Sequence, residues 1–151
     1  KISETMIHKT LTVGFSDLDG FIKLIELVGE EKAIKSLFIK FKEIEKIIDS
    51  KNGEIRKIIG DSVLFSFANI QDAVSAGKDI STISICEKGE IFYFYTGLAT
   101  GTVYEIEMGN DNKDIYGKSV NTAGLLVKEA KSNKDRIAIC PHTISGLNSR
   151  S

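Results

Sequence analysis

The chain has 151 residues, of which 42% are hydrophobic, enough for one domain over residues 1–151 with a single sizeable core. Its 20 basic and 21 acidic residues give a net charge of -1, so the charge gives no reason to expect a nucleic-acid or anionic-membrane surface. Cys86 and Cys140 are too few for a disulfide framework, which suits a reducing compartment, and we expect both in the core.

No stretch reaches the ~20 consecutive apolar residues that a membrane helix needs, and no charged-then-apolar signal segment opens the sequence. We therefore expect a cytoplasmic domain that makes no direct membrane contact. The sequence begins at Lys1 rather than at a methionine, which fits a fragment of a longer protein, including the cytosolic domain of a membrane-attached one.

The first strand is predicted over residues 11–15, an apolar run with β-branched members that leads into the acidic segment 16–20, SDLDG. The spacing of apolar residues predicts a short helix over 21–28 and a longer helix over 31–49. The core stripe of the longer helix is predicted to consist of Ile34, Leu37, Phe38, Phe41, Ile44 and Ile48.

Residues 53–67, GEIRKIIGDSVLFSF, predict a β-hairpin, because the residues on both sides of Gly60 and Asp61 follow a period of two. Gly60 can adopt the positive φ that the first central position of a type II′ turn requires, so two residues suffice to reverse the chain. Asp61 is then expected at the tip of the hairpin.

The remaining elements follow from the same signals. A third helix begins after Asn69, a typical N-cap residue, and an antiparallel pair of strands is predicted within residues 91–108, punctuated by Gly97 and Gly101. A polar loop over 109–114 precedes the next helix. That last helix, opened by Ser119, and a final strand over 136–140, ended by Pro141, complete the chain.

The order of these elements contains a βαββαβ core. It predicts a ferredoxin-like α+β fold with a mainly antiparallel sheet and helices on one face.

Two aspartates follow or interrupt predicted strands, Asp17 after the first strand and Asp61 in the hairpin turn. Carboxylate oxygens are ligands that hard divalent cations prefer, so the pair is a candidate metal site. The structural alternatives are helix capping by Asp19 and simple turn formation by Asp61.

Three blocks together resemble the catalytic domain of class III nucleotide cyclases, the adenylate and guanylate cyclase family. The blocks are FSDLDGF at 15–21, GEIRKIIGDSVLFSF at 53–67, and TGLATG with DIYGKSVNTAGLL at 96–101 and 114–126. They occur in the order and spacing of the family and cover the chain from about residue 10 to its end.

The resemblance implies that Asp17 and Asp61 hold two divalent ions, Mg²⁺ or Mn²⁺, assisted by the backbone carbonyl of Leu18. Two such ions can activate the ribose 3′ hydroxyl and neutralise the triphosphate. The family shares each site across a head-to-tail homodimer, with the metals held by one subunit and the purine read by the other.

Lys57 and Asp114 match the family's purine-reading pair. Adenine offers an acceptor at N1 and a donor at its amino group, which suits a lysine and an aspartate, so the resemblance implies ATP as the substrate. Without the resemblance, Lys57 could equally be a solvated strand lysine and Asp114 a loop carboxylate.

Asn121 matches the asparagine that orients the ribose in the family. Four residues later the family has an arginine that stabilises the transition state, and this chain has Leu125 instead. Gly124 and Ile106 also differ from the family pattern.

The sequence therefore supports two functions. The first is an adenylate cyclase that forms 3′,5′-cyclic AMP and pyrophosphate with impaired turnover, and the second is a degenerate cyclase-like regulatory module that binds nucleotide or dimerises. A diguanylate cyclase is disfavoured because its Gly-Gly-Asp/Glu-Glu-Phe signature is lacking.

Overall fold

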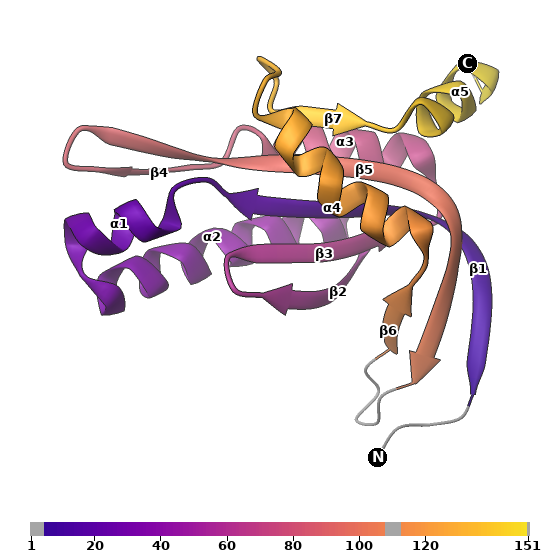
Figure 1. The fold of residues 1–151 in the computed structure, drawn as a ribbon, viewed down its shortest axis with the longest axis horizontal. Helices are drawn as coiled ribbons and strands as arrows, with labels where there is room; N and C mark the ends of the chain where they lie inside the picture. Colours follow the sequence, from indigo (N-terminus) through magenta and orange to yellow (C-terminus); the bar gives the residue numbers. More distant parts are fainter. Residues whose placement is uncertain (1–4, 108–112, 151) are drawn as a thin grey trace.

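The computed structural model of the chain describes residues 5–107 and 113–150 (Figure 1). The strands are β1 (Met6–Leu18), β2 (Glu54–Ile59), β3 (Ser62–Phe67), β4 (Ser84–Glu87), β5 (Glu90–Glu107), β6 (Lys113–Tyr116) and β7 (Ile137–Ile139). The helices are α1 (Phe21–Val28), α2 (Glu30–Ser50), α3 (Ile70–Ile80), α4 (Lys118–Ala130) and α5 (Pro141–Arg150). None of the helices within these ranges is long and apolar enough to cross a membrane.

The strands form one sheet in the order β2-β3-β1-β5-β4, in which β6 and β7 also pair with β5. All pairings are antiparallel except that of β7 with β5. The long strands β1 and β5 run side by side and curve together, so that the end of β5 and the short strand β6 lie below β2 (Figure 1). The predicted α+β class with a mainly antiparallel sheet is confirmed.

The two faces of the sheet carry separate apolar cores. Phe65 packs with α1, α2 and α3 in one core, whereas its neighbour Leu64 packs with α4 in the other, as expected for successive residues of a strand. The expectation that the helices share one face thus holds for α1, α2 and α3, while α4 packs on the opposite face.

Strand β5 is continuous over 18 residues, and the prediction of two strands within 91–108 is wrong. Gly97 and Gly101, which suggest breaks in the sequence, both lie inside the strand where α4 crosses it. A Cβ at position 97 would lie 2.2 Å from the carbonyl oxygen of Ala123, and one at position 101 would lie 3.2 Å from the Cβ of Ser119. The two glycines therefore allow close helix packing rather than a turn.

The predicted hairpin is confirmed, with Ile59 paired to Ser62 across the two-residue turn. Gly60 has a φ of 57°, and Asp61 is not among the residues with positive φ, in agreement with a type II′ turn. The simple period of two fails in β2, where Ile55 pairs with Phe65 but Lys57 pairs with Leu64. Arg56 is the extra residue of a β-bulge.

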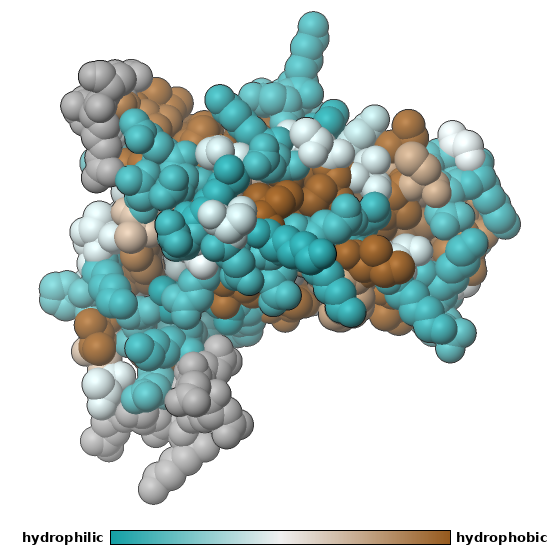
Figure 2. All heavy atoms as spheres, turned by 180° about the vertical axis from the view of Figure 1, so that it is seen from behind, coloured by the Kyte–Doolittle hydropathy of each residue, from teal (hydrophilic) through white to brown (hydrophobic). Residues whose placement is uncertain are grey.

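Helix α2 buries a narrower stripe than the sequence predicts. Leu37, Phe41, Ile44 and Ile48 are buried as expected, but Ile34 and Phe38 are 43% and 46% exposed. The helix covers the sheet with one side only, so these two residues lie at the flank of the contact. From behind, this side of the molecule is mainly hydrophilic, with smaller apolar patches between the charged side chains (Figure 2).

Three elements are absent from the sequence prediction, β4, β6 and α5. The predicted polar loop over 109–114 overlaps β6 at residues 113 and 114, and the rest of it lies outside the described residues. Strand β4 forms a hairpin with β5 at the edge of the sheet, so Cys86 is exposed while Ile85 is buried. Helix α5 begins at Pro141, which was expected to end a strand but whose fixed φ also suits the first turn of a helix. The expectation of two core cysteines is therefore wrong for Cys86, which is exposed. Cys140 is half-buried.

Candidate active site

The two predicted metal ligands lie together at one end of the molecule. The chain continues as a strand through Asp17, so this residue is part of β1 and not of a loop, and it pairs with Ser62 of β3. Asp61 occupies the adjacent turn, and its carbonyl oxygen accepts a hydrogen bond from the Leu18 amide at 3.2 Å. Both aspartates and Leu18 line a groove of about 450 Å³.

The carboxylates in this groove are electrostatically destabilised. Burial raises the pKa of Asp17, and the negative charge of Asp61 raises it further, whereas a hydrogen bond with Ser62 and the charge of Lys131 lower it. Burial also raises the pKa of Asp61, an effect that nearby Asp19 increases and Lys131 opposes. The groove thus holds more negative charge than its protein surroundings compensate.

An unused ligand atom is consistent with a cation at this site. The Oδ1 atom of Asp17 is buried and has no hydrogen-bond partner in the protein, which is costly for a carboxylate oxygen. Within residues 5–107 and 113–150, no group of three or more His, Cys, Asp and Glu side chains could hold a metal ion. Asp17, Asp61 and the Leu18 carbonyl offer oxygen atoms only, which fits Mg²⁺ or Mn²⁺ with the remaining positions left for water or phosphate.

One residue of the groove was not found from the sequence. Lys131, just after α4, lies with its Nζ 3.2 Å from Oδ1 of Asp19 and lines the same groove. A single lysine in a charged segment carries no signal of such a placement, because it depends on how α4 crosses the sheet.

The predicted purine-reading residues are also brought together. Nζ of Lys57 lies 3.1 Å from Oδ2 of Asp114, although β2 and β6 are not neighbours in the sheet. The Lys57 side chain is 48% exposed and that of Asp114 is 11% exposed. The second carboxylate oxygen of Asp114 accepts a hydrogen bond from the Ile115 amide at 2.9 Å, which fixes the orientation of the carboxylate.

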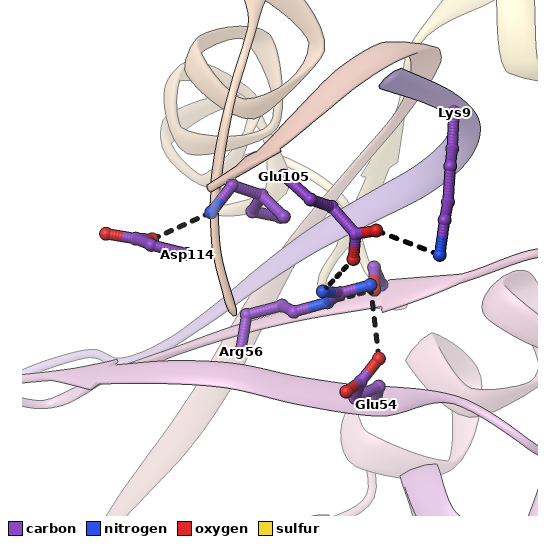
Figure 3. A network of polar contacts seen from close by, with 7 residues as sticks. Lys9, Glu54, Arg56, Glu105 and Asp114 are labelled. Atoms are coloured by element: carbon purple, nitrogen blue, oxygen red, sulfur yellow. Dashed lines mark hydrogen bonds and ion pairs between the residues drawn. The ribbon is translucent and has the colours of Figure 1, made fainter. Parts of the chain in front are cut away.

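A buried ion-pair network adjoins this pair and was likewise missed. Arg56 contacts Glu105 of β5, and the two side chains are only 4% and 3% exposed (Figure 3). Lys9 of β1 approaches the other carboxylate oxygen of Glu105 at 2.8 Å. Burial alone would raise the pKa of Glu105, but the hydrogen bonds and charges of Lys9 and Arg56 outweigh it and lower the pKa.

Asn121 and Leu125 lie one turn apart on the exposed side of α4. Leu125 is 67% exposed, whereas Ala123 and Leu126 of the same helix are buried against the sheet. The position at which the sequence departs from the cyclase pattern therefore faces outward and is not part of the core.

Comparisons with known proteins point to one family of enzymes. A model of the adenylate and guanylate cyclase catalytic domain matches residues 4–151. An uncharacterized protein of Mycobacterium tuberculosis is 28% identical over 130 residues, or 85% of this chain and 32% of that protein. An adenylate cyclase of Streptomyces coelicolor is 28% identical over 140 residues, or 90% of this chain and 34% of that enzyme. The chain thus spans about a third of the length of these curated relatives.

Solved structures share the fold. A bacterial light-regulated adenylyl cyclase has a TM-score of 0.83 at 22% identity, over 95% of this chain and 46% of that one. A dimeric guanylyl cyclase domain of the aquatic fungus Blastocladiella emersonii has a TM-score of 0.81 at 21% identity, over 95% of this chain and 86% of that one. The catalytic core of a rhodopsin-guanylyl cyclase with converted specificity, in complex with ATPαS, has a TM-score of 0.79 at 24% identity, over 95% of this chain and 84% of that one.

At these identities the solved structures show the fold alone, but the family model covers nearly the whole chain, including both acidic positions and the segment of α4. On this evidence the chain belongs to the adenylate and guanylate cyclase catalytic domain family.

Proposed function

We propose that this chain is an adenylate cyclase domain, which converts ATP to 3′,5′-cyclic AMP and pyrophosphate. In this reaction the ribose 3′ oxygen forms a bond to the α-phosphorus, the bond from that phosphorus to the oxygen bridging to the β-phosphate breaks, and the 3′ proton is released. The observation that carries the choice of ATP is the pair of Lys57 and Asp114 at 3.1 Å.

The pair can still read a base while its members contact each other. A lysine ammonium has three donors and a carboxylate has about four acceptor positions, so each group keeps free capacity. Lys57 would donate to N1 of adenine, and Asp114 would accept from the amino group. Guanine presents a donor and an acceptor in the reverse places, which would leave both protein groups mismatched.

The other residues have separate tasks. Asp17 and Asp61, with the Leu18 carbonyl, would hold two divalent ions, which would neutralise the triphosphate and lower the pKa of the 3′ hydroxyl. Asn121 would orient the ribose from the exposed side of α4.

We also propose that the site is shared in a head-to-tail homodimer. The acidic groove and the purine pair belong to different parts of the sheet, and the groove is not lined by Lys57 or Asp114. In such a dimer, Lys57 and Asp61 of one chain would serve opposite sites.

The exposed Leu125 favours a second candidate, a cyclase-like regulatory module that binds nucleotide without turnover. Incubation of the purified protein with Mn²⁺ and either ATP or GTP, followed by measurement of both cyclic nucleotides, separates the two. Cyclic AMP formed from ATP supports the enzyme. Nucleotide binding without any cyclic product supports the regulatory module, and cyclic GMP as the main product contradicts the base assignment.

A further inference from the structure

Two consecutive basic residues of β2, Arg56 and Lys57, point to the same face of the sheet. In a regular strand successive side chains point to opposite faces. Ile55 packs into the core beneath α1, α2 and α3, so Arg56 faces the α4 side. In a regular strand Lys57 would then point back to the face covered by α1, α2 and α3. The bulge at Arg56 changes this phase, because Lys57 pairs with Leu64, a member of the core beneath α4.

The bulge is held in place by the guanidinium group of Arg56. Its Nε donates to Oγ of Ser66 at 2.8 Å, Nη1 donates to the carboxylate of Glu105, and Nη2 lies 3.1 Å from Oε2 of Glu54. Each of the three nitrogens thus has a partner, and Figure 3 shows the guanidinium between the strands that supply them. Only Glu54 among these partners is a surface residue, with a side chain that is 64% exposed.

The network ties β2 to strands that are not its neighbours. The sheet order places β3 and β1 between β2 and β5, yet Arg56 reaches Glu105 of β5 and Lys57 reaches Asp114 of β6. The first contact is buried and the second is half exposed to solvent, so the first is screened less and is the more rigid of the two.

We propose that Arg56 is a positioning residue, which acts through Glu105 to hold Asp114 beside Lys57 and thereby sets the choice of base. The consequence for the base rests on the proposed function, whereas the contact of Lys57 with Asp114 does not. The two-residue turn fixes the face of Lys57, because Lys57, Ile58 and Ile59 pair regularly with Leu64, Val63 and Ser62. Glu105 pairs with Ile115, the neighbour of Asp114, so without the Arg56–Glu105 pair the end of β5 and β6 can move away from Lys57.

The contact between Lys57 and Asp114 can be measured without nucleotide. A carbodiimide joins an amine and a carboxylate that are in contact, and peptide mass spectrometry gives the yield of the Lys57–Asp114 cross-link. The ion pair of Lys131 with Asp19, at 3.2 Å, has no contact with Arg56 or Glu105 and serves as an internal standard. In Arg56→Met the yield at Lys57 should fall on the order of tenfold relative to this standard, because such reactions depend steeply on geometry.

Two further variants keep the test decisive. Arg56→Met leaves Glu105 buried beside Lys9 alone and can unfold the protein, whereas Arg56→Met with Glu105→Leu replaces the buried pair by apolar groups and is expected to fold. Glu54→Gln is the matched control, because it removes only the exposed partner of Arg56. The double variant should lose the Lys57–Asp114 cross-link, and the control should keep it. A folded double variant with the parental yield would overturn the proposal.

Nucleotide binding then tests the consequence. Competition of ATP and GTP for the Mn²⁺-loaded protein should show that the double variant and Lys57→Met both lose on the order of tenfold in the ATP to GTP affinity ratio, the effect of one hydrogen bond to a charged group. A lost cross-link together with a Lys57→Met protein that keeps the parental ratio would uphold the positioning role and refute base reading by Lys57. If the double variant keeps the parental ATP to GTP affinity ratio while Lys57→Met loses it, the link from Arg56 to the choice of base is refuted.

Discussion

Lys57 and Asp114 are 57 positions apart in the sequence, yet Nζ of the lysine lies 3.1 Å from Oδ2 of the aspartate. The curvature of β1 and β5 produces this contact, because it carries β6 to a position beside β2 that hydrogen bonding within the sheet does not give (Figure 1). A donor and an acceptor thus stand side by side, which is the arrangement that the proposed reading of adenine needs.

Exchange of this pair should change the base preference. In Lys57→Glu with Asp114→Cys, the lysine donor becomes an acceptor and the acceptor becomes a small group, so the preference for ATP should weaken or reverse. Binding competition between ATP and GTP gives the ratio, and Lys118→Met, which removes an exposed lysine of α4, is the control. Equal affinity of the parent for both nucleotides would show that the pair does not read the base.

Loss of either groove carboxylate should abolish metal-dependent nucleotide binding. Asp17→Asn and Asp61→Asn keep the size of the side chain and remove the charge that would hold the ions, while neither residue belongs to an apolar core. Calorimetry with Mn²⁺ and ATP measures the loss, and Asp49→Asn on the exposed side of α2 is the control. Unchanged binding in both variants would refute the metal assignment.

The same two variants should alter the dependence of stability on pH. Because the pKa values of Asp17 and Asp61 are raised in the folded protein, their contribution to the free energy of unfolding is fully present below the ordinary value of 3.8 and is lost as the pH rises through the raised values. In metal-free buffer, Asp17→Asn should therefore be more stable than the parent at neutral pH and approach it in acid.

Urea unfolding across this pH range measures the difference between parent and variant. Glu105, whose pKa is lowered, contributes in the opposite sense, with stability lost as the pH falls below its ordinary value of 4.5. This contribution is common to both proteins and cancels in the difference. A parent that gains stability over Asp17→Asn as the pH rises would contradict the prediction.

Replacement of Leu125 by arginine should raise the production of cyclic AMP. A preorganised cationic donor at a developing negative charge is worth on the order of 10²–10³ in rate. Leu125 is 67% exposed, so the change leaves no cavity in the core. Leu125→Gln, which lengthens the side chain without a charge, is the control. A folded Leu125→Arg protein that binds nucleotide but shows no gain would favour the regulatory module.

Mixing two impaired variants tests the shared site. In a heterodimer of Asp61→Asn and Lys57→Met, one site carries both substitutions and the other carries neither. With random association, an equal mixture should recover roughly a quarter of the parental activity or nucleotide binding, since half of the dimers have one intact site of two. At an ATP concentration that saturates the parent but not Lys57→Met, neither variant alone should reach this level. A mixture that gives no more than the two variants alone would indicate that each site lies within one chain.

The sequence by itself determined the local elements, and its motifs named the residues of the proposed site. The Gly60–Asp61 turn, the N-cap at Asn69 and the helical stripe of α2 depend on neighbouring residues, whose signals are contained in short windows. The hydrogen-bond from the Asp72 amide to Asn69, at 3.0 Å, was predictable for this reason. The cyclase motifs likewise identified Asp17 and Asp61, which the fold brings into one groove.

The tertiary structure decided what depends on distant contacts. Judged from its neighbours in the sequence, Gly97 suggests a break in the strand. Only the passage of α4 across β5 shows that it permits close packing of the helix on the sheet. The bulge at Arg56 cannot be recognised without Glu105, which is 49 positions away, because an alternating strand and a bulged strand have the same local composition. The contact of Lys57 with Asp114 was thus not contained in either segment, since it depends on the curved sheet and on a buried ion pair between β2 and β5.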